Sequence, residues 1–180
     1  MNVIIETERT LLREFKEADC QAVFDFGSDK EVQKYTGDVL LKSVDQAKNI
    51  IKNVWFDDYK KYGYGRWAVV HKKDKKVIGF AGLKYLPEFD KTDIGFRFLP
   101  RYWGKGLATE VSLPIIKYGF EKLGLKEIIG IADSDNIGSV KVLEKIGLVY
   151  YKSAIYDTDD TKKYKWFKLK KEAYIERFAK

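Results

Sequence analysis

The sequence predicts a single mixed α/β domain, and three observations support this prediction. The chain has 180 residues, a length that suits one domain with a sizeable core. Segments of strand-like and helix-like periodicity follow one another as strand, helices, antiparallel strands, helix, strand, helix and hairpin. No repeat, low-complexity tract or linker divides residues 1–180, so we expect one domain across the whole chain.

The N-terminal third is predicted to hold one strand and three helices. Residues 4–15 have the pattern of a strand, and residues 16–26 follow with helical spacing. Capping-box patterns at residues 28–31 and 43–46 predict two further helix starts, and the second of these helices should run to about Tyr59.

The middle of the chain is predicted to form a hairpin, a strand and a helix. Residues 66–71 and 76–85 flank a charged turn, as in a β-hairpin. Residues 92–99 form the next predicted strand, and a helix should follow over about residues 105–124. An interior proline removes a backbone hydrogen bond, so Pro114 predicts a kink in this helix or an irregular start.

The C-terminal part is predicted to hold a strand, a helix and a second hairpin. Residues 127–132 read as a short buried strand, and the helix after it should be capped by Asp135 or Asn136. Residues 148–155 and 163–169 then flank a D-T-D-D turn, which predicts the hairpin.

Most of the positive charge lies at the C-terminal end. The net charge is +7, and residues 161–180 hold eight Lys or Arg against two Glu. Such a segment could contact nucleic acid, a ribosomal surface or an acidic ligand, or it could be a solvated edge strand followed by a polar helix face. One cysteine excludes a disulfide framework, and no apolar run approaches a bilayer span, so we expect a soluble cytoplasmic protein.

Two glycines stand at the predicted strand-to-helix turn, in the stretch R-Y-W-G-K-G-L-A-T from residue 101 to 109. A P-loop needs Ser or Thr after its lysine, but Gly106 follows Lys105, and a dinucleotide fingerprint needs Gly or Ala where Thr109 stands. The stretch does fit [Q/R]-x-x-G-x-[G/A]. Glycines allow close backbone approach, and the unpaired amides of a helix start attract anions, so the turn predicts a diphosphate site. Arg101 would add positive charge beside it.

Three motifs in a fixed order carry a family resemblance. They are T-E-R-T-L-L-R-E-F, then I-G-F-R-F-L-P-R-Y-W-G-K-G-L-A-T-E, then D-N-I-G-S-V-K-V-L-E-K-I-G-L. The chain resembles the GNAT superfamily of N-acetyltransferases, and within it the ribosomal-protein, RimJ/RimL-type branch. The resemblance covers about residues 6–170.

The resemblance implies a central, mostly antiparallel twisted sheet of about six to seven strands, splayed at the acetyl-CoA site and flanked by about four helices. It implies direct transfer of an acetyl group from acetyl-CoA to a primary amine. The acceptor would be an alanine- or serine-like protein N-terminus or a small amine. A homodimer is left open, and we expect no metal, no membrane and no nucleic-acid partner.

The resemblance also implies which residues bind the cofactor. Phe98 and Leu99 would pair through their backbone with the pantetheine arm, and Arg101 and Lys105 would add charge. Asn136 would contact the CoA arm, serve as a plain helix cap, or do both. Backbone amides would hold the diphosphate over the run Trp103, Gly104, Lys105, Gly106, Leu107, Ala108 and Thr109.

For catalysis the resemblance implies a proton donor and a base. Many members of the superfamily place a tyrosine seven residues after the asparagine, where this chain has Leu143. As in the RimL-type branch, Ser139 is then the candidate donor to the leaving thiolate, although it could be only an exposed serine. Asp93 is the candidate base, with Glu88 and Asp90 as alternatives that act through water or are only solvated charges.

Two other functions remain open at this point. The chain could be a non-catalytic RNA- or ribosome-binding protein, because Tyr164, Trp166 and Phe167 alternate with lysines and could stack on bases. Those aromatic residues are also explained as part of a core strand. An acyl-CoA sensor is the second alternative, suggested by the missing tyrosine at Leu143.

Overall fold

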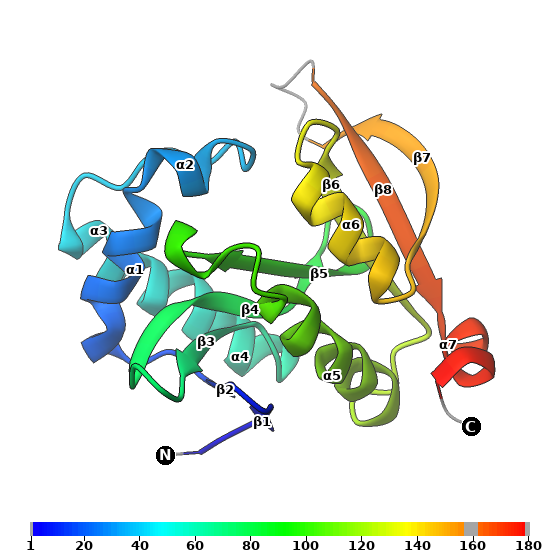
Figure 1. Ribbon diagram of the computed structural model, residues 1–180, viewed down its shortest axis with the longest axis horizontal. Helices are drawn as coiled ribbons and strands as arrows, with labels where there is room; N and C mark the ends of the chain where they lie inside the picture. The colour runs from blue at the N-terminus through cyan, green and yellow to red at the C-terminus, as the bar shows by residue number, and fades with distance from the viewer. Residues whose placement is uncertain (1, 157–161, 179–180) are drawn as a thin grey trace.

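A computed structural model describes residues 2–156 and 162–178, and these residues form one sheet of eight strands in the order β1-β2-β3-β4-β5-β6-β8-β7 (Figure 1). Only β5 and β6 run parallel, and all other neighbours are antiparallel. The strands are β1 (Ile5–Glu6), β2 (Thr10–Arg13), β3 (Arg66–His71), β4 (Lys76–Leu86), β5 (Lys91–Phe98), β6 (Glu127–Asp133), β7 (Val149–Ile155) and β8 (Lys163–Lys170).

The sheet has more strands than we predicted, because residues 4–15 form two strands and not one. Ile5 pairs with Leu12, and the Thr7 amide donates to the Thr10 carbonyl at 2.9 Å, so the chain reverses between β1 and β2. The Thr7 and Thr10 hydroxyls, 2.7 Å apart, stabilise this turn. The alternating apolar pattern is that of a strand on both sides of the turn, which is why the sequence did not reveal it.

The helices also exceed the expected four or so. They are α1 (Cys20–Gly27), α2 (Lys30–Gln33), α3 (Val44–Ile50), α4 (Phe56–Tyr62), α5 (Leu107–Glu121), α6 (Ile137–Lys145) and α7 (Lys171–Phe178). A π-helical segment, η2 (Ile51–Trp55), joins α3 to α4, and the 3₁₀ turns η1 (Glu17–Asp19) and η3 (Pro100–Tyr102) precede α1 and α5.

One of the two predicted helix caps is displaced by a residue. Ser43 caps α3, since its hydroxyl accepts from the Gln46 amide at 3.3 Å. The cap of α2 is Asp29 and not Ser28, because the Asp29 carboxylate accepts from the Glu31 and Val32 amides at 2.9 and 3.2 Å. A carboxylate one residue on reaches these amides while Ser28 still closes α1.

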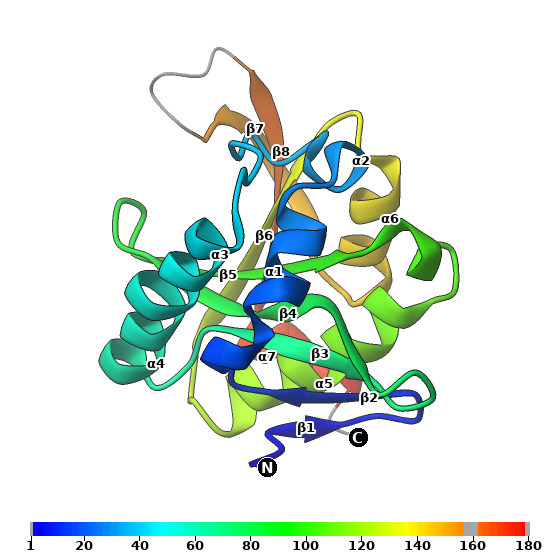
Figure 2. The ribbon, with the colours of Figure 1, turned by 90° about the vertical axis from the view of Figure 1, so that its left-hand side faces the viewer.

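Helices cover both faces of the sheet (Figures 1 and 2). α5 packs on one face, where Trp67 of β3 meets Tyr118 edge to face at 5.3 Å between ring centroids. α1, α3 and α4 pack on the other face, where Phe15 stacks on Trp55 at 4.0 Å and Phe80 fills the centre. Each of these buried apolar side chains contributes about 1.5–3 kcal/mol to folding.

α5 continues through Pro114 from Leu107 to Glu121. The proline lacks the N–H that would reach the carbonyl of Glu110, so the helix loses one internal hydrogen bond without ending. The start of α5 lies nearly two turns away.

The basic C-terminal segment is not a solvated edge strand. β8 lies between β6 and β7, and Tyr164, Trp166 and Phe167 are all buried. α7 follows with only Tyr174 buried, and its exposed residues combine the expected charged side chains with the apolar Ile175 and Phe178. The D-T-D-D turn of the second predicted hairpin lies outside the described residues. Within the described ranges, no helix combines the length and apolar character that crossing a bilayer requires.

Candidate functional site

The sheet opens between β5 and β6. Asp93 and Ile129 are the one registered pair between these strands, and beyond it β5 and β6 take widely different directions (Figures 1 and 2). The Leu99 amide donates to the Ile78 carbonyl at 3.0 Å, so Leu99 directs its backbone groups toward β4. Backbone groups alternate along a strand, so those of Phe96 and Phe98 face the gap. This is the splay that the sequence analysis expected.

The glycine turn sits where β5 passes through η3 into α5. Gly104 and Gly106 have φ values of +70° and +77°, in the left-handed region that favours glycine. The first backbone bond of the helix runs from the Glu110 amide to the Gly106 carbonyl at 3.0 Å. Within the described residues, none of the six consecutive amides of residues 104–109 has a hydrogen-bond acceptor. A helix start of this kind attracts anions.

Two of the predicted binding groups are already used inside the protein. The Leu99 amide bonds to Ile78, so it is not available to a ligand, and the Leu99 carbonyl already accepts from the Tyr102 amide at 2.9 Å. The Trp103 amide donates to the Pro100 carbonyl at 3.0 Å, and the Trp103 indole donates to the Phe98 carbonyl at 2.6 Å. These contacts remove the amides of Leu99 and Trp103 from the predicted set and leave the amide of Phe98.

The side chains of the next residues contribute packing. Leu107 is 2% exposed and belongs to the core under α5, and Ala108 packs against the same core. Small or apolar side chains at these two positions keep the helix close to the sheet, so any contribution to binding comes from their amides.

A cationic pocket adjoins the glycine turn. It is lined by Lys76, Arg101 and Lys105 together with Tyr102 and Asp74. The Tyr102 hydroxyl donates to Asp74 at 2.6 Å, and this bond, more than the neighbouring His71, lowers the pKa of the Asp74 carboxyl. Three cations against one carboxylate give the pocket a positive potential beside the free amides.

The start of α6 lies across the gap. β5 and β6 are parallel, so the helices that follow them begin at the same end of the sheet. Asn136 caps α6 and Asp135 does not, since the Asn136 side-chain oxygen accepts from the Ser139 amide at 3.0 Å. The side-chain nitrogen of Asn136 takes no part in this cap. Ser139 is partly exposed in the first turn, and Leu143 is buried.

Asp93 lies where the strands part, and it is buried and paired. Its carboxylate contacts Arg66 at 2.5 Å, and Arg66 also donates to the backbone carbonyls of Asp93 and Gly82. Burial raises the pKa of Asp93, although Arg66 and the Ile131 amide favour its charged form. A Cβ at Gly95 would lie 2.5 Å from the Arg66 guanidinium, so glycine makes room for this pair.

The two alternative carboxylates are placed differently. Glu88 and Asp90 are exposed on the β4–β5 turn, where the Tyr85 hydroxyl donates to Asp90 at 2.6 Å. Asp93 is therefore the one of these three that is held at the gap. Sequence reasoning missed Arg66 because it is 27 residues away in the chain and enters only through the antiparallel pairing of β3 and β4.

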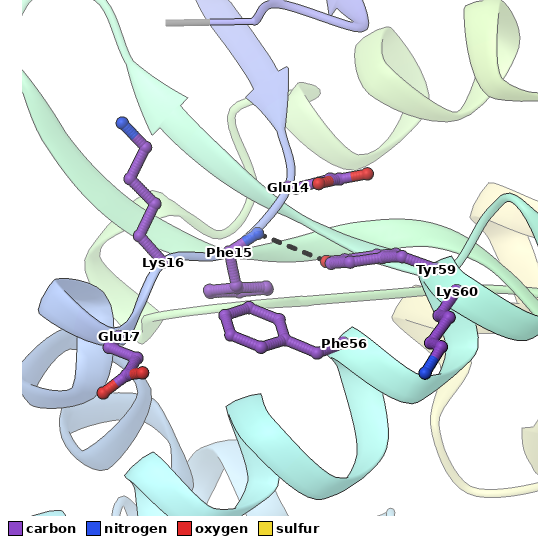
Figure 3. Close-up of a pocket in the computed structure, with 7 residues that line it drawn as sticks. All are labelled: Glu14, Phe15, Lys16, Glu17, Phe56, Tyr59 and Lys60. Carbon is purple, nitrogen blue, oxygen red and sulfur yellow. Dashed lines mark hydrogen bonds between the residues drawn. The ribbon is translucent and has the colours of Figure 1, made fainter.

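A further open pocket lies between the end of β2 and α4 (Figure 3). Phe15 and Phe56 form its apolar wall, and the Tyr59 hydroxyl accepts from the Phe15 amide at 3.3 Å. None of its lining residues belongs to the glycine turn, to β5 or to α6, so it takes no part in the site described above.

Comparison with known proteins agrees with this geometry. The family described as "Acetyltransferase (GNAT) domain" matches residues 9–149. The N-acetyltransferase YoaA of Bacillus subtilis, whose function is uncharacterised, is 31% identical over 166 residues, which is 87% of this chain and 93% of YoaA.

Solved structures show the same fold. A GNAT-family acetyltransferase from Bacillus anthracis superposes with a TM-score of 0.78 at 27% identity, covering 93% of this chain and 98% of that one. RimL, a ribosomal L7/L12 α-N-protein acetyltransferase solved with CoA, reaches a TM-score of 0.80 at 12% identity, covering 96% and 99%. From its family match, its relatives and its splayed sheet, the chain is an N-acetyltransferase of the GNAT family, whose members use acetyl-CoA.

Proposed function

We propose that the chain transfers the acetyl group of acetyl-CoA directly to a primary amine, and that the glycine turn binds the diphosphate of the donor. The observation that carries this proposal is the run of six amides over residues 104–109 that have no acceptor within the described residues. They stand at the start of α5, beside an unpaired edge of β5 and a pocket lined by three cations. CoA carries several phosphate charges, and this site has the complementary charge.

Each part of the donor meets a different group in this proposal. The amides of residues 104–109 hold the diphosphate, with Arg101 and Lys105 beside it. The backbone of Phe98 pairs with the pantetheine arm in the gap, and the side-chain nitrogen of Asn136 donates to the same arm from the other side. The arm then ends near Asp93, where β5 and β6 meet.

The chemistry requires two proton movements. An alkylammonium has a pKa near 10, so the amine must lose a proton before its nitrogen can attack the thioester carbonyl. We assign the removal of that proton, directly or through water, to Asp93, which burial and Arg66 hold at the gap. The carbon–sulfur bond breaks as the carbon–nitrogen bond forms, and the Ser139 hydroxyl supplies a proton to the departing thiolate while it takes up the second proton that the acylated nitrogen releases, so the serine ends neutral.

The acceptor approaches from the face that carries Asp93, Gly95 and Arg97. Arg97 is held against the Phe80 ring and pairs with Asp38 at 2.6 Å, which brings the segment after α2 to the edge of this face. RimL acts on a protein N-terminus, and this chain shares its fold. We therefore place an alanine- or serine-like N-terminal amine first among the acceptors and a small amine second.

Two measurements test this function. Calorimetry should show CoA binding to the wild-type protein, and free thiol should be released from acetyl-CoA faster in the presence of an acceptor. The acceptor panel is a set of peptides beginning with Ala or Ser, the same peptides with acetylated N-termini as matched controls, a polyamine, an amino sugar and an amino acid. Absence of CoA binding contradicts the whole proposal. CoA binding without thiol release for any amine would favour the acyl-CoA sensor.

The RNA-binding alternative loses the feature that suggested it. Trp166 and Phe167 are each 1% exposed and Tyr164 is 9% exposed, so their rings are not available to stack on bases. No other observation favours this alternative over transfer to an amine.

A further inference from the structure

The turn between β1 and β2 is bonded to the glycine turn through Glu110. The Glu110 side chain accepts from the Thr7 hydroxyl at 2.6 Å, from the Arg9 amide at 2.9 Å and from the Arg9 Nε at 2.6 Å. A second guanidinium nitrogen of Arg9 lies 2.6 Å from the same carboxylate. Both oxygens of Glu110 are thus held by a segment about 100 residues earlier in the chain.

The third guanidinium nitrogen of Arg9 forms a hydrogen bond with the glycine turn itself. It donates to the backbone carbonyl of Lys105 at 2.9 Å, and Lys105 stands between the two left-handed glycines. The carbonyl of Lys105 and the amide of Gly106 belong to one planar trans peptide, so they point in opposite directions. Because Arg9 holds the carbonyl on its own side, the Gly106 amide points away from Arg9. That amide is one of the six without an acceptor.

Glu110 would otherwise weaken an anion site. Its carboxylate lies in the first turn of α5, next to the backbone amides that would bind the anion. A negative side chain there stabilises the helix dipole but repels a bound anion. The Arg9 guanidinium neutralises the carboxylate and keeps it turned toward β1 and β2, with 17% of the Glu110 side chain exposed.

We propose that Arg9 is a positioning residue of the cofactor site, which neutralises Glu110 and fixes the Lys105–Gly106 peptide so that the Gly106 amide faces the diphosphate. This inference rests on the proposed function, because it assumes that the glycine turn holds that diphosphate. Lysine cannot replace Arg9, since one ammonium group cannot bond the carboxylate and the carbonyl in the fork that a guanidinium provides.

The inference predicts which ligands an Arg9→Gln variant loses. CoA and dephospho-CoA both carry the diphosphate, and each should bind about tenfold more weakly, the equivalent of about 1.4 kcal/mol. Pantetheine lacks it and should compete with CoA unchanged. Arg9→Lys should show most of the loss while keeping the charge. In the double variant Arg9→Gln/Glu110→Gln, removal of the unpaired carboxylate should restore part of the CoA affinity.

Lys72→Gln is the matched control, because Lys72 contacts Glu6 and the Thr7 carbonyl of the same turn but neither Glu110 nor Lys105. It should bind all three ligands as the wild type does. A merely structural role for Arg9 would weaken pantetheine as much as CoA, and that result overturns the inference. Unchanged CoA binding by Arg9→Gln also overturns it. Failure of the wild type to bind CoA would instead refute the proposed function, so the two failures are distinguishable.

Discussion

Substitution of Gly104 by alanine tests the glycine turn most directly. Gly104 has φ +70°, and no atom lies within 4 Å of the position that a Cβ would take. The alanine therefore meets no clash, and its cost is the left-handed backbone alone, about 1–2 kcal/mol. For a chain of this size, each kcal/mol lowers the melting temperature by about 2–4 °C.

The binding effect follows from how the strain is relieved. Without ligand, the alanine variant can rotate its peptides out of the left-handed region, and the free amides no longer converge. Binding of CoA must restore the conformation of the glycine turn, so strain that the free variant relieves is lost from binding instead of from stability, and full relief of the 1–2 kcal/mol gives about 5- to 30-fold weaker binding. Calorimetric titration of CoA, together with a thermal melt, measures both quantities.

Two other glycines provide matched controls. Gly63 and Gly124 have φ values of +75° and +69°, and a Cβ added at either residue would have no atom within 4 Å. They follow the ends of α4 and α5, away from the helix start, so alanine at either position should cost similar stability and leave CoA affinity unchanged. Equal CoA affinity in the Gly104→Ala and Gly124→Ala variants would refute the assignment of the turn.

Three further predictions concern individual side chains. Burial alone would raise the pKa of Glu110, but the hydrogen bonds from Thr7 and Arg9 outweigh it and lower the pKa below its usual value of 4.5. The ion pair therefore stabilises the fold above about pH 4.5. This stabilisation is lost as the pH falls through the folded-state pKa of Glu110. The unfolding free energies of wild type and Glu110→Gln, from urea titrations, should differ at pH 7 and converge in acid; a constant difference contradicts this. Asp93→Asn should lower kcat by roughly 10²-fold or more with an unchanged Kd for CoA, and normal turnover would exclude Asp93 as the base. Ser139→Ala should lower kcat comparably for acetyl-CoA, and wild-type turnover would rule out the serine as donor.

The parts of the site that could be predicted from the sequence depend on neighbouring residues. Two glycines, an apolar run before them and a helical pattern after them define the strand-to-helix turn. The Asn136 cap depends on a residue three positions away. Local physics of this kind needs no knowledge of the sheet order.

The parts that escaped prediction depend on contacts between distant segments. Arg9 lies about 100 residues before Glu110 and Lys105, so its contacts with them arise only from the folding of the whole sheet. Arg66 reaches Asp93 only across β4. β8 is buried because it inserts between β6 and β7 in the sheet. The residue pattern of β8 alone does not reveal this strand order.

The period of two residues along β5 explains how one strand can serve two substrates. Ile94, Phe96 and Phe98 direct their side chains into the core under α5, while Asp93 and Arg97 direct theirs to the opposite face. The backbone groups of Phe96 and Phe98 point in a third direction, into the gap beside β6. In the proposed site, donor binding through the backbone therefore constrains few side chains, and residues on the opposite face are free to change with the acceptor. Under the proposed function, the glycine turn identifies the acetyl donor, while the acceptor meets side chains such as Arg97, which lies inside the second motif, and Asp38, which lies in none of the three.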